Sequence, residues 1–211
     1  MKYLICSDIH GSASACQKVI QYFRDMHCDY LIILGDILYH GPRNPLPEGH
    51  NPKLVAQMLN ERADKIIACR GNCDAEVDQM VLHFPILSDY NLVVDEGIRI
   101  FCTHGHIYAP ERSDDSIAVE GSSVPPLWSS TPALHGTSLP VLYDNSIVLY
   151  GHTHIQVLEK NKAGSIVCNP GSVSLPKGES PAGFALYENG QISLFNINGE
   201  ILAKSESLRK Q

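Results

Sequence analysis

The sequence predicts an α/β fold in which two mixed sheets pack face to face and helices cover the outside. Up to about residue 70, short apolar runs alternate with stretches of helical periodicity, an order typical of parallel strands joined by right-handed crossovers. After about residue 90, short apolar runs follow one another at turn signals, which indicates hairpins and a second sheet. Packing the two sheets against each other is the simplest way to bury the apolar faces of both.

Three strands are expected in the first half, at Lys2–Cys6, Tyr30–Leu34 and Lys65–Cys69. The second of them is apolar throughout, as expected of a strand that is covered on both faces. Two helices are expected between the strands. Ala13–His27 has apolar residues at the spacing of one helical face, and Pro52–Ala63 has its proline in the first turn, where proline is favoured.

The strands of the second half are short and separated by turns. The turns Asp95-Glu96-Gly97 and Glu188-Asn189-Gly190 contain the glycine that tight hairpins favour. The expected strands are Asn91–Val94, Arg99–Cys102, Ile147–Tyr150, Gln156–Glu159, Ser165–Val167, Phe184–Tyr187 and Gln191–Asn196.

Composition excludes several classes of protein. With 211 residues, of which 44% are apolar, the chain can bury a core without disulfides. It has no apolar run near the ~20 residues that cross a bilayer, so we expect no membrane contact. A net charge of −7 argues against binding to nucleic-acid duplexes. The seven cysteines form no CxxC pair, which favours a reducing cytoplasm.

Five short motifs with metal-competent side chains follow expected strands, and each motif contains a glycine beside such a side chain. Because sites in such sheets gather outside the carboxyl ends of parallel strands, we expect these loops to converge. The five motifs are Asp8-Ile9-His10-Gly11, Gly35-Asp36, Gly71-Asn72-Cys73-Asp74, Thr103-His104-Gly105-His106 and Gly151-His152-Thr153-His154.

The chemistry of these side chains points to a transition-metal site. Carboxylates, an amide oxygen and imidazoles suit Mn²⁺, Fe or Zn²⁺ better than Ca²⁺ or Mg²⁺. In an extended segment, residues two apart share a side, so Asp8-x-His10 and His152-x-His154 can each face one cluster. With Asp8 and Asp36 as the only anionic ligands, two divalent ions would leave a charge of about +2, which attracts phosphate and lowers the pKa of bound water. The sequence therefore predicts hydrolysis of a phosphate ester.

In this order the five motifs resemble the calcineurin-like metallophosphoesterase superfamily, whose pattern is D-x-H, G-D, G-N-[HC], H and G-H-x-H. The resemblance is greatest to the YfcE-type phosphodiesterases, and it covers nearly the whole chain except about 113–140. Three further segments carry it: Gly41–Gly49, Arg70–Asp74 and Asn169–Ser174.

The resemblance implies a four-layer α/β/β/α sandwich and two divalent ions, with manganese expected and iron, zinc, nickel or cobalt as alternatives. It implies attack on phosphorus by a metal-bridging hydroxide. Asp36 would bridge the ions, His106 and Asn72 would be catalytic, and Arg43 and Cys73 would contact the substrate. One ion would be held by Asp8, His10, Asp36 and His154, and the other by Asp36, Asn72, His104 and His152.

Cys73 departs from the pattern of many superfamily phosphatases, which have a histidine there that can protonate the leaving group. A thiol is a poorer general acid at neutral pH than an imidazole. We therefore expect a phosphodiesterase that depends on good leaving groups, acting on a small phosphate ester. A phosphomonoesterase of the same fold is the alternative.

Other classes of function fit the same residues less well. A scaffold like the retromer subunit of this superfamily has an eroded metal site, whereas all seven expected ligands are present here. The chain has no cysteine with an arginine six positions later and no GxxxxGK[ST] loop, which excludes cysteine-dependent phosphatases and P-loop enzymes. Two local alternatives stay open: Asp8 as a cap for the helix that opens near Ser12, and Asn169-Pro170-Gly171 as a turn only. A homo-oligomer is compatible with the sequence.

The stretch 113–140 is rich in Ser, Thr and Pro and shows no sustained periodicity. A stretch of this length without regular structure is usually functional or disordered. It follows His106, at the expected metal edge, and precedes the strand that leads into His152. We expect residues 1–211 to form one domain, in which 113–140 is an insertion that acts as a partial lid or as a mobile loop.

Overall fold

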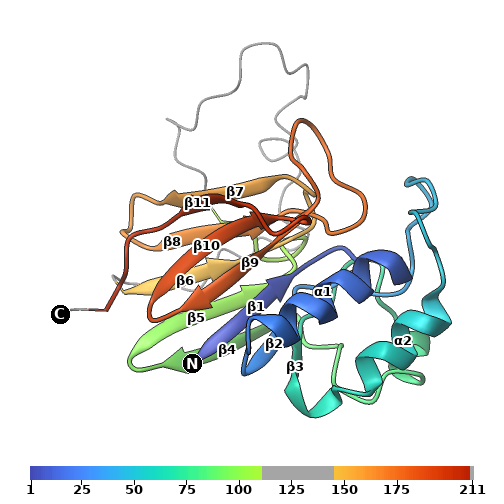
Figure 1. The fold of residues 1–211 in the computed structure, drawn as a ribbon. Coiled ribbons are helices and arrows are strands. Elements are labelled where there is room, and N and C mark those ends of the chain that lie inside the picture. Colours follow the sequence, from blue (N-terminus) through green and yellow to red (C-terminus); the bar gives the residue numbers. More distant parts are fainter. Residues whose placement is uncertain (111–144, 210–211) are drawn as a thin grey trace.

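Two mixed sheets lie together at the centre of the molecule, and helices cover an outer face (Figure 1). The computed structural model describes residues 1–110 and 145–209. The expected insertion at 113–140 lies outside the described residues. The arrangement confirms the predicted α/β fold with two mixed sheets.

The first sheet has six strands in the order β11-β10-β9-β1-β2-β3. Strands β1, β2 and β3 are parallel, and β9, β10 and β11 continue the sheet as antiparallel neighbours. The strands span β1 Lys2–Cys6, β2 Tyr30–Ile33, β3 Ile66–Ala68, β9 Gly183–Glu188, β10 Gln191–Asn196 and β11 Ile201–Lys204.

The second sheet has five strands in the order β4-β5-β6-β8-β7. Strands β5, β6 and β8 are parallel, while β4 and β7 pair antiparallel at the two sides. The strands span β4 Tyr90–Asp95, β5 Ile98–Thr103, β6 Ser146–Leu149, β7 Gln156–Lys160 and β8 Ile166–Pro170.

Helix α1 (Ala13–Asp25) packs on the outer face of the first sheet. Its first turn is capped by Ser12, whose Oγ accepts a 3.2 Å hydrogen bond from the backbone N–H of Ala15. Side-chain caps of this kind satisfy the unpaired N–H groups at a helix start. Since Ser12 is the cap, the alternative in which Asp8 caps the helix is not needed.

Helix α2 (Pro52–Asn60) begins at the predicted proline and ends three residues before the predicted end. A short 3₁₀ turn, η1 (Ala63–Lys65), leads from it into β3. Two short elements were not expected from the sequence, the helix α3 (Glu76–Gln79) and the strand β11. Among the described residues, no helix has the length and apolarity to span a bilayer.

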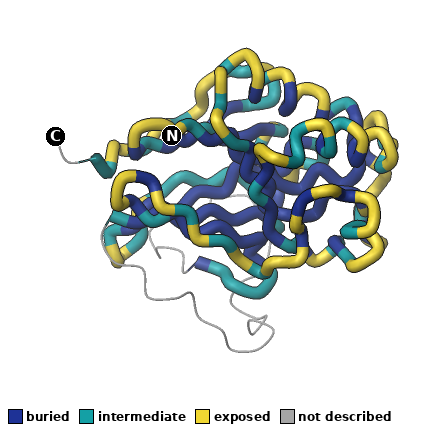
Figure 2. Tube along the Cα trace, turned by 90° about the horizontal axis from the view of Figure 1, so that it is seen from below, coloured by how far each residue is buried: buried dark blue, intermediate teal, exposed yellow. Residues whose placement is uncertain are grey.

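Apolar side chains fill two layers. One layer, which includes Leu4, lies between the first sheet and the helices, and the other, which includes Ile5, lies between the two sheets. Neighbouring residues of β1 therefore point to opposite faces of the first sheet, and both faces are covered. This agrees with the apolar composition of the strands, which predicted burial on both faces. Figure 2 shows the buried residues running through the middle of the molecule and the exposed ones around it.

Both predicted hairpin turns are present. Glu96 and Gly97 have φ of 48° and 82°, and Asn189 and Gly190 have φ of 52° and 77°. Positive φ at both central positions is the conformation that suits two-residue hairpins, because its twist matches that of the strands.

A buried polar contact joins the two sheets. The hydroxyl of Tyr187 on β9 donates a 2.8 Å hydrogen bond to Oδ2 of Asp95 on β4, and the Met1 amino group lies 3.3 Å from the other oxygen. Burial, followed by the nearby Asp95, raises the pKa of the Tyr187 hydroxyl. The hydroxyl therefore stays protonated and acts as the donor.

Replacing Tyr187 by phenylalanine should lower the free energy of unfolding by about 2 kcal/mol, because a buried hydrogen bond to a charged group is lost. Urea unfolding of the Tyr187→Phe protein would measure this as a lower midpoint with an unchanged slope. The matched control is Tyr90→Phe, since Tyr90 is 50% exposed. Equal midpoints for the two variants would show that the contact between the sheets adds no stability.

Candidate metal centre

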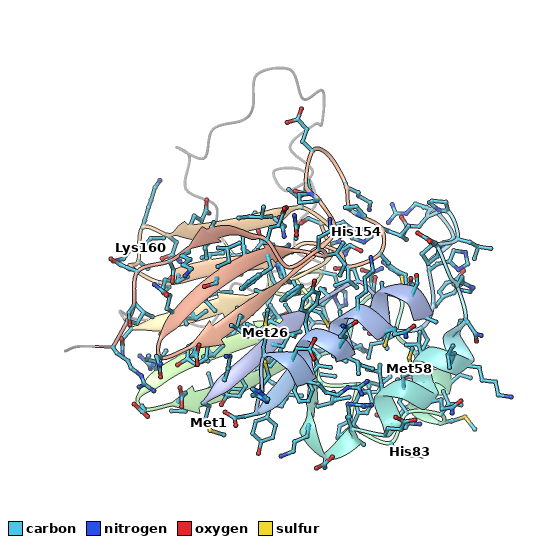
Figure 3. All side chains as sticks on the ribbon, viewed as in Figure 1. Met1, Met26, Met58, His83, His154 and Lys160 are labelled. Carbon is cyan, nitrogen blue, oxygen red and sulfur yellow. The ribbon has the colours of Figure 1, made fainter. Side chains whose placement is uncertain are left out.

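Five loops meet at the edge where parallel strands of both sheets end. Three leave the first sheet and two leave the second, so the centre lies across the junction of the sheets. In Figure 3, His154 lies at this edge, whereas Lys160 lies at the other end of β7. The loops carry Asp8 and His10 after β1, Asp36 after β2, Asn72 after β3, His104 after β5, and His152 and His154 after β6.

The backbone of these loops is left-handed at five of the seven predicted ligand residues. Their φ angles are 55° at Asp8, 51° at His10, 55° at Asp36, 67° at His152 and 62° at His154. The expectation that Asp8-x-His10 and His152-x-His154 are extended is therefore wrong. Positive φ is uncommon outside glycine and persists where the surrounding structure holds it, often at functional sites.

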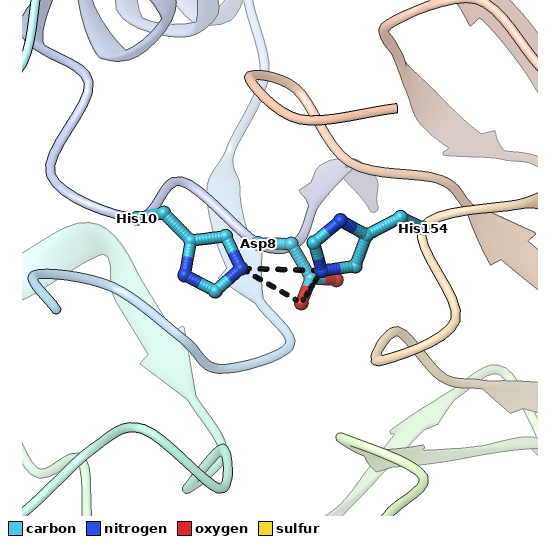
Figure 4. A group of neighbouring side chains, drawn as sticks. All are labelled: Asp8, His10 and His154. Carbon is cyan, nitrogen blue, oxygen red and sulfur yellow. Dashed lines mark hydrogen bonds and ion pairs between the residues drawn. The ribbon is translucent and has the colours of Figure 1, made fainter. Parts of the chain in front are cut away.

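One group of donor atoms consists of Asp8, His10 and His154, which point toward one another (Figure 4). Oδ1 of Asp8 lies 3.2 Å from Nε2 of His154 and 3.7 Å from Nε2 of His10. The two Nε2 atoms are 3.2 Å apart. All three side chains are buried.

The hydrogen bonds on the far side of the rings determine which nitrogen carries the proton. Nδ1 of His10 lies 2.8 Å from the carbonyl oxygen of Tyr39, and Nδ1 of His154 lies 2.5 Å from that of Leu175. A carbonyl oxygen only accepts, so each Nδ1 donates and the Nε2 of a neutral ring presents a lone pair. Oδ1 of Asp8 is buried and accepts no hydrogen bond from the described residues. Three electron-rich atoms facing one another fit a cation between them.

A second group of donor atoms adjoins the first. Nε2 of His104 lies 3.1 Å from Oδ1 of Asn72 and 3.5 Å from Oδ1 of Asp36. Nδ1 of His104 donates to the carbonyl oxygen of Leu34 at 2.6 Å, so the Nε2 of the neutral ring is the atom that presents a lone pair. Burial opposes protonation of this ring, but Asp36 and Asp8 outweigh it and raise the pKa of His104. The ring of His152 lies 5.2 Å from that of His104, centroid to centroid.

Asp36 lies between the two groups. Its Oδ2 is 3.8 Å from Nε2 of His10, while its Oδ1 faces His104. Each carboxylate oxygen thus faces a different group of imidazoles. Asn72 is exposed, which leaves the second group open to solvent.

The electrostatics keep the Asp8 carboxylate charged and two of the imidazoles neutral. Burial opposes ionisation of Asp8, but the neighbouring His154 and His104 outweigh it and hold its pKa below the ordinary value. Burial lowers the pKa of His10, and it lowers that of His152 to about 4. At neutral pH both rings are therefore unprotonated, the form that binds metal ions.

The structure places Cys73 and His106 beside these groups. The backbone N–H of Cys73 donates a 2.8 Å hydrogen bond to Oδ1 of Asp36. Burial, and then Asp36, raises the pKa of the Cys73 thiol. The ring of His106 lies 5.3 Å from that of His104, and burial together with His104 lowers the pKa of His106 to about 4.

Arg43 is not brought into contact with the donor groups. Its side chain is exposed in the loop between β2 and α2, and no hydrogen bond or ion pair joins it to another residue of the described chain. The same loop does approach the centre at two other residues. The carbonyl oxygen of Tyr39 accepts a hydrogen bond from His10, and a methyl group added at Gly41 would lie 3.1 Å from Sγ of Cys73.

A segment with no assigned role, residues 172–175, fixes the first donor group. Ser172 and Ser174 donate hydrogen bonds of 2.8 and 3.0 Å to the carbonyl oxygen of Asp8. The carbonyl oxygen of Leu175 accepts a hydrogen bond from Nδ1 of His154. The signal in the sequence was the pair of serines that follows Pro170-Gly171. A second side chain without an assigned role is Asp74, at the end of the Gly71-Asn72-Cys73-Asp74 motif.

Asn169 makes the expected turn and also contacts the site. Its Oδ1 accepts a 2.8 Å hydrogen bond from the N–H of Gly171, which is a turn within the segment. Its Nδ2 donates a 2.8 Å hydrogen bond to the carbonyl oxygen of Gly151, next to His152. The residue therefore joins the end of β8 to the loop that carries two of the histidines.

Comparison with known proteins gives concordant matches. A family model described as the calcineurin-like phosphoesterase superfamily domain matches residues 1–191. The chain is 44% identical over 201 residues to phosphodiesterase YfcE of Escherichia coli strain K12, covering 95% of this chain and 94% of that protein.

Solved structures agree with the fold. The structure described as YfcE, a phosphoesterase from E. coli, has a TM-score of 0.83 and 41% identity, covering 99% of this chain and 100% of that one. Vps29 from Entamoeba histolytica, solved in complex with zinc, has a TM-score of 0.57 and 15% identity, covering 97% and 98% of the two chains. At that identity the second likeness concerns the fold alone.

The close approach of Gly71 to Asp36 yields a test of the donor geometry. A methyl group at Gly71 would overlap the carboxylate and the backbone nitrogen of Asp36, so Gly71→Ala should displace Asp36. We expect the variant to bind divalent metal ions about 10–100-fold more weakly and so to retain less metal after dialysis, as when a metal ligand loses its support. Elemental analysis would measure it. The control is Gly97→Ala in the β4–β5 hairpin, where the added methyl group meets no atom within 4 Å; the φ of 82° strains the alanine, but at the end of β5 away from the centre. Equal metal content in both variants would contradict the geometry.

Proposed function

The chain belongs to the calcineurin-like phosphoesterase superfamily, and on this basis we propose that it is a phosphodiesterase that works with two divalent metal ions. One observation carries the proposal: two groups of imidazole and oxygen donors adjoin, and Asp36 faces both of them. The 44% identical relative, a phosphodiesterase, supports the diester as substrate class.

We assign the first ion to Asp8, His10, Asp36 and His154. The second is assigned to Asp36, Asn72, His104 and His152. The facing lone pairs of the imidazoles and the unpaired Oδ1 of Asp8 support a cation in the first group. The family implies divalent metal ions, and we propose manganese, because a mixed nitrogen and oxygen donor set suits Mn²⁺, with iron, zinc, nickel or cobalt as alternatives.

When bound, two such ions would neutralise the charge of the phosphate and lower the pKa of a water molecule at the centre. The chain's own part is to place its donors and to bind the ester. The carbonyl oxygens of Leu34, Tyr39 and Leu175 orient three imidazole rings. Second-shell hydrogen bonds of this kind determine the tautomer and direction of a metal-binding histidine.

We propose that His106 and Asn72 contact the phosphate on the open side of the centre. With a pKa lowered to about 4, His106 is neutral at pH 7 and would donate a hydrogen bond from its ring rather than transfer a proton. Arg43 would reach the ester from its exposed loop, and Cys73 would lie against it. This arrangement binds an anion without supplying a strong acid.

The absence of a strong acid at position 73 favours diesters with good leaving groups. Because its pKa is raised, the Cys73 thiol holds its proton at neutral pH and protonates a leaving alkoxide poorly. A protein scaffold without activity is the less favoured alternative, since buried carboxylate and imidazole donors gather at one edge rather than apart. We further propose a single domain over 1–211 and a cytoplasmic location, which the free state of all seven cysteines supports.

Activity should depend on metal and on the charge of Asp36. Removing the metal with a chelator should abolish diester hydrolysis, and Asp36→Asn should lower kcat/KM by roughly 10²-fold or more, the size typical of losing a positioned electrostatic group. Rates would be measured on an aryl phosphodiester with added Mn²⁺, and exposed Asp25→Asn is the control. Chelated protein that keeps its full diesterase rate would rule the proposal out.

A histidine in place of Cys73 should raise monoesterase activity relative to diesterase activity. An imidazole that titrates near pH ~6.5 is a more capable acid at neutral pH than a thiol. Aryl mono- and diesters with the same leaving group would be compared in Cys73→His, with Cys73→Ser as the control that removes the thiol without adding an imidazole. An unchanged ratio at normal metal content would count against the leaving-group argument.

A further inference from the structure

Asp74 is a buried carboxylate in the loop after β3 whose two oxygens are occupied by backbone groups. It is 8% exposed. Its Oδ2 accepts hydrogen bonds from the N–H of Asp36 at 2.8 Å and of Gly71 at 2.7 Å, and its Oδ1 accepts one from Ile37 at 2.8 Å.

These three bonds join two loops that are far apart in the sequence. Asp36 and Ile37 follow β2, whereas Gly71 precedes Asn72 in the loop after β3. The bond to Gly71 alone would make Asp74 an ordinary turn residue. The other two bonds span 38 and 37 residues. They come from the backbone N–H groups of Asp36, whose carboxylate lies between the donor groups, and of its neighbour Ile37.

The same loop also holds the side chain of Asp36. The N–H of Cys73, the residue before Asp74, donates to Oδ1 of Asp36. The backbone of Asp36 has a φ of 55°, a conformation that needs support from its surroundings. Through these contacts the loop after β3 fixes both the main chain and the carboxylate of Asp36.

Folding alone does not explain a carboxylate at this position. Asp74 is buried and interacts electrostatically with Asp36, another carboxylate. Burying a charge beside a like charge is unfavourable unless it is well hydrogen-bonded. What an aspartate provides here is two oxygens that only accept, which match three N–H donors. An asparagine would turn its amide N–H group toward at least one of them.

We propose that Asp74 is a positioning residue that holds Asp36 between the two donor groups and thereby sets the affinity for the metal pair. The inference rests on the proposed metal function. In Asp74→Asn, Asp36 would lose part of its backbone support while every donor side chain is retained. The affinity for Mn²⁺ should then fall by about 10–100-fold, the range seen when the support of a metal ligand is removed.

The experiment compares Asp74→Asn with a matched variant. Asp78 is four residues further along, and its carboxylate accepts one backbone hydrogen bond, from Ala75 at 2.9 Å, so Asp78→Asn serves as the control. Calorimetric titration of metal-free protein with Mn²⁺ would give the number and affinity of bound ions, and thermal unfolding of the metal-free proteins would give Tm. We expect similar Tm values for the two variants and weaker Mn²⁺ binding in Asp74→Asn only.

The magnetic coupling of the bound ions supplies a second readout. At saturating Mn²⁺, electron paramagnetic resonance should show a coupled pair in the wild-type protein and weaker coupling in Asp74→Asn, because a displaced Asp36 would no longer face both donor groups. A residue that only stabilises the fold would lower Tm without changing the coupling.

The outcomes separate this inference from the proposed function. Wild-type protein that binds no Mn²⁺ would overturn both. Wild-type protein that binds two ions, together with unchanged affinity and coupling in Asp74→Asn, would overturn the role of Asp74 alone. If Asp74→Asn does not fold, Asp74→Glu decides, since it keeps both acceptor oxygens and the charge but lengthens the side chain. Weaker Mn²⁺ binding by Asp74→Glu than by Asp78→Asn would support the inference, and equal Mn²⁺ binding by the two variants would overturn it.

Discussion

The position of the Asp36 carboxylate is the constraint on which the rest of the centre depends. Its two oxygens face different groups of imidazoles, at 3.8 Å from His10 and 3.5 Å from His104. The first of these groups combines loops from both sheets. The carboxylate therefore has to be held by contacts from outside the two donor groups. Asp74 and Cys73 supply that support from the loop after β3.

Several features of this edge are unfavourable for folding taken one at a time. Five of the proposed ligand residues have left-handed backbone, and two Nε2 lone pairs face each other at 3.2 Å. An oxygen of Asp8 is buried and accepts no hydrogen bond from the part of the chain that the structure describes. Strain and repulsion of this kind cluster at functional sites, where other contacts determine the geometry. A bound cation would remove the repulsion, and a ligand that binds only the folded state adds to its stability. The centre is therefore best understood as shaped for metal binding rather than for stability.

The sequence predicted those parts of the molecule whose structure is determined by residues close together in the chain. Apolar runs defined β1 and β2, a proline defined the start of α2, and Glu96-Gly97 defined a hairpin turn. The proposed ligands were singled out because each of their five motifs follows a strand and contains a glycine. The left-handed conformation of Asp8 and His10 was missed, because nothing in the two-residue spacing distinguishes it from an extended segment. The short elements α3 and β11, of four residues each, are too brief to show a period.

The supporting residues were missed for a different reason. The partners of Asp74 lie 37 and 38 residues away, and those of Ser172 lie 164 residues away at Asp8. Such contacts follow from which loops the sheets bring together. A local signal such as the two serines after Pro170-Gly171 does not show which distant loop they contact. The central claim is that two adjoining donor groups each hold an ion. Anomalous diffraction from crystals grown with Mn²⁺ tests it most directly. The account predicts two peaks, one among Asp8, His10 and His154 and one beside His104 and Asn72, with Asp36 between them. A single peak, or none at this edge, would contradict it.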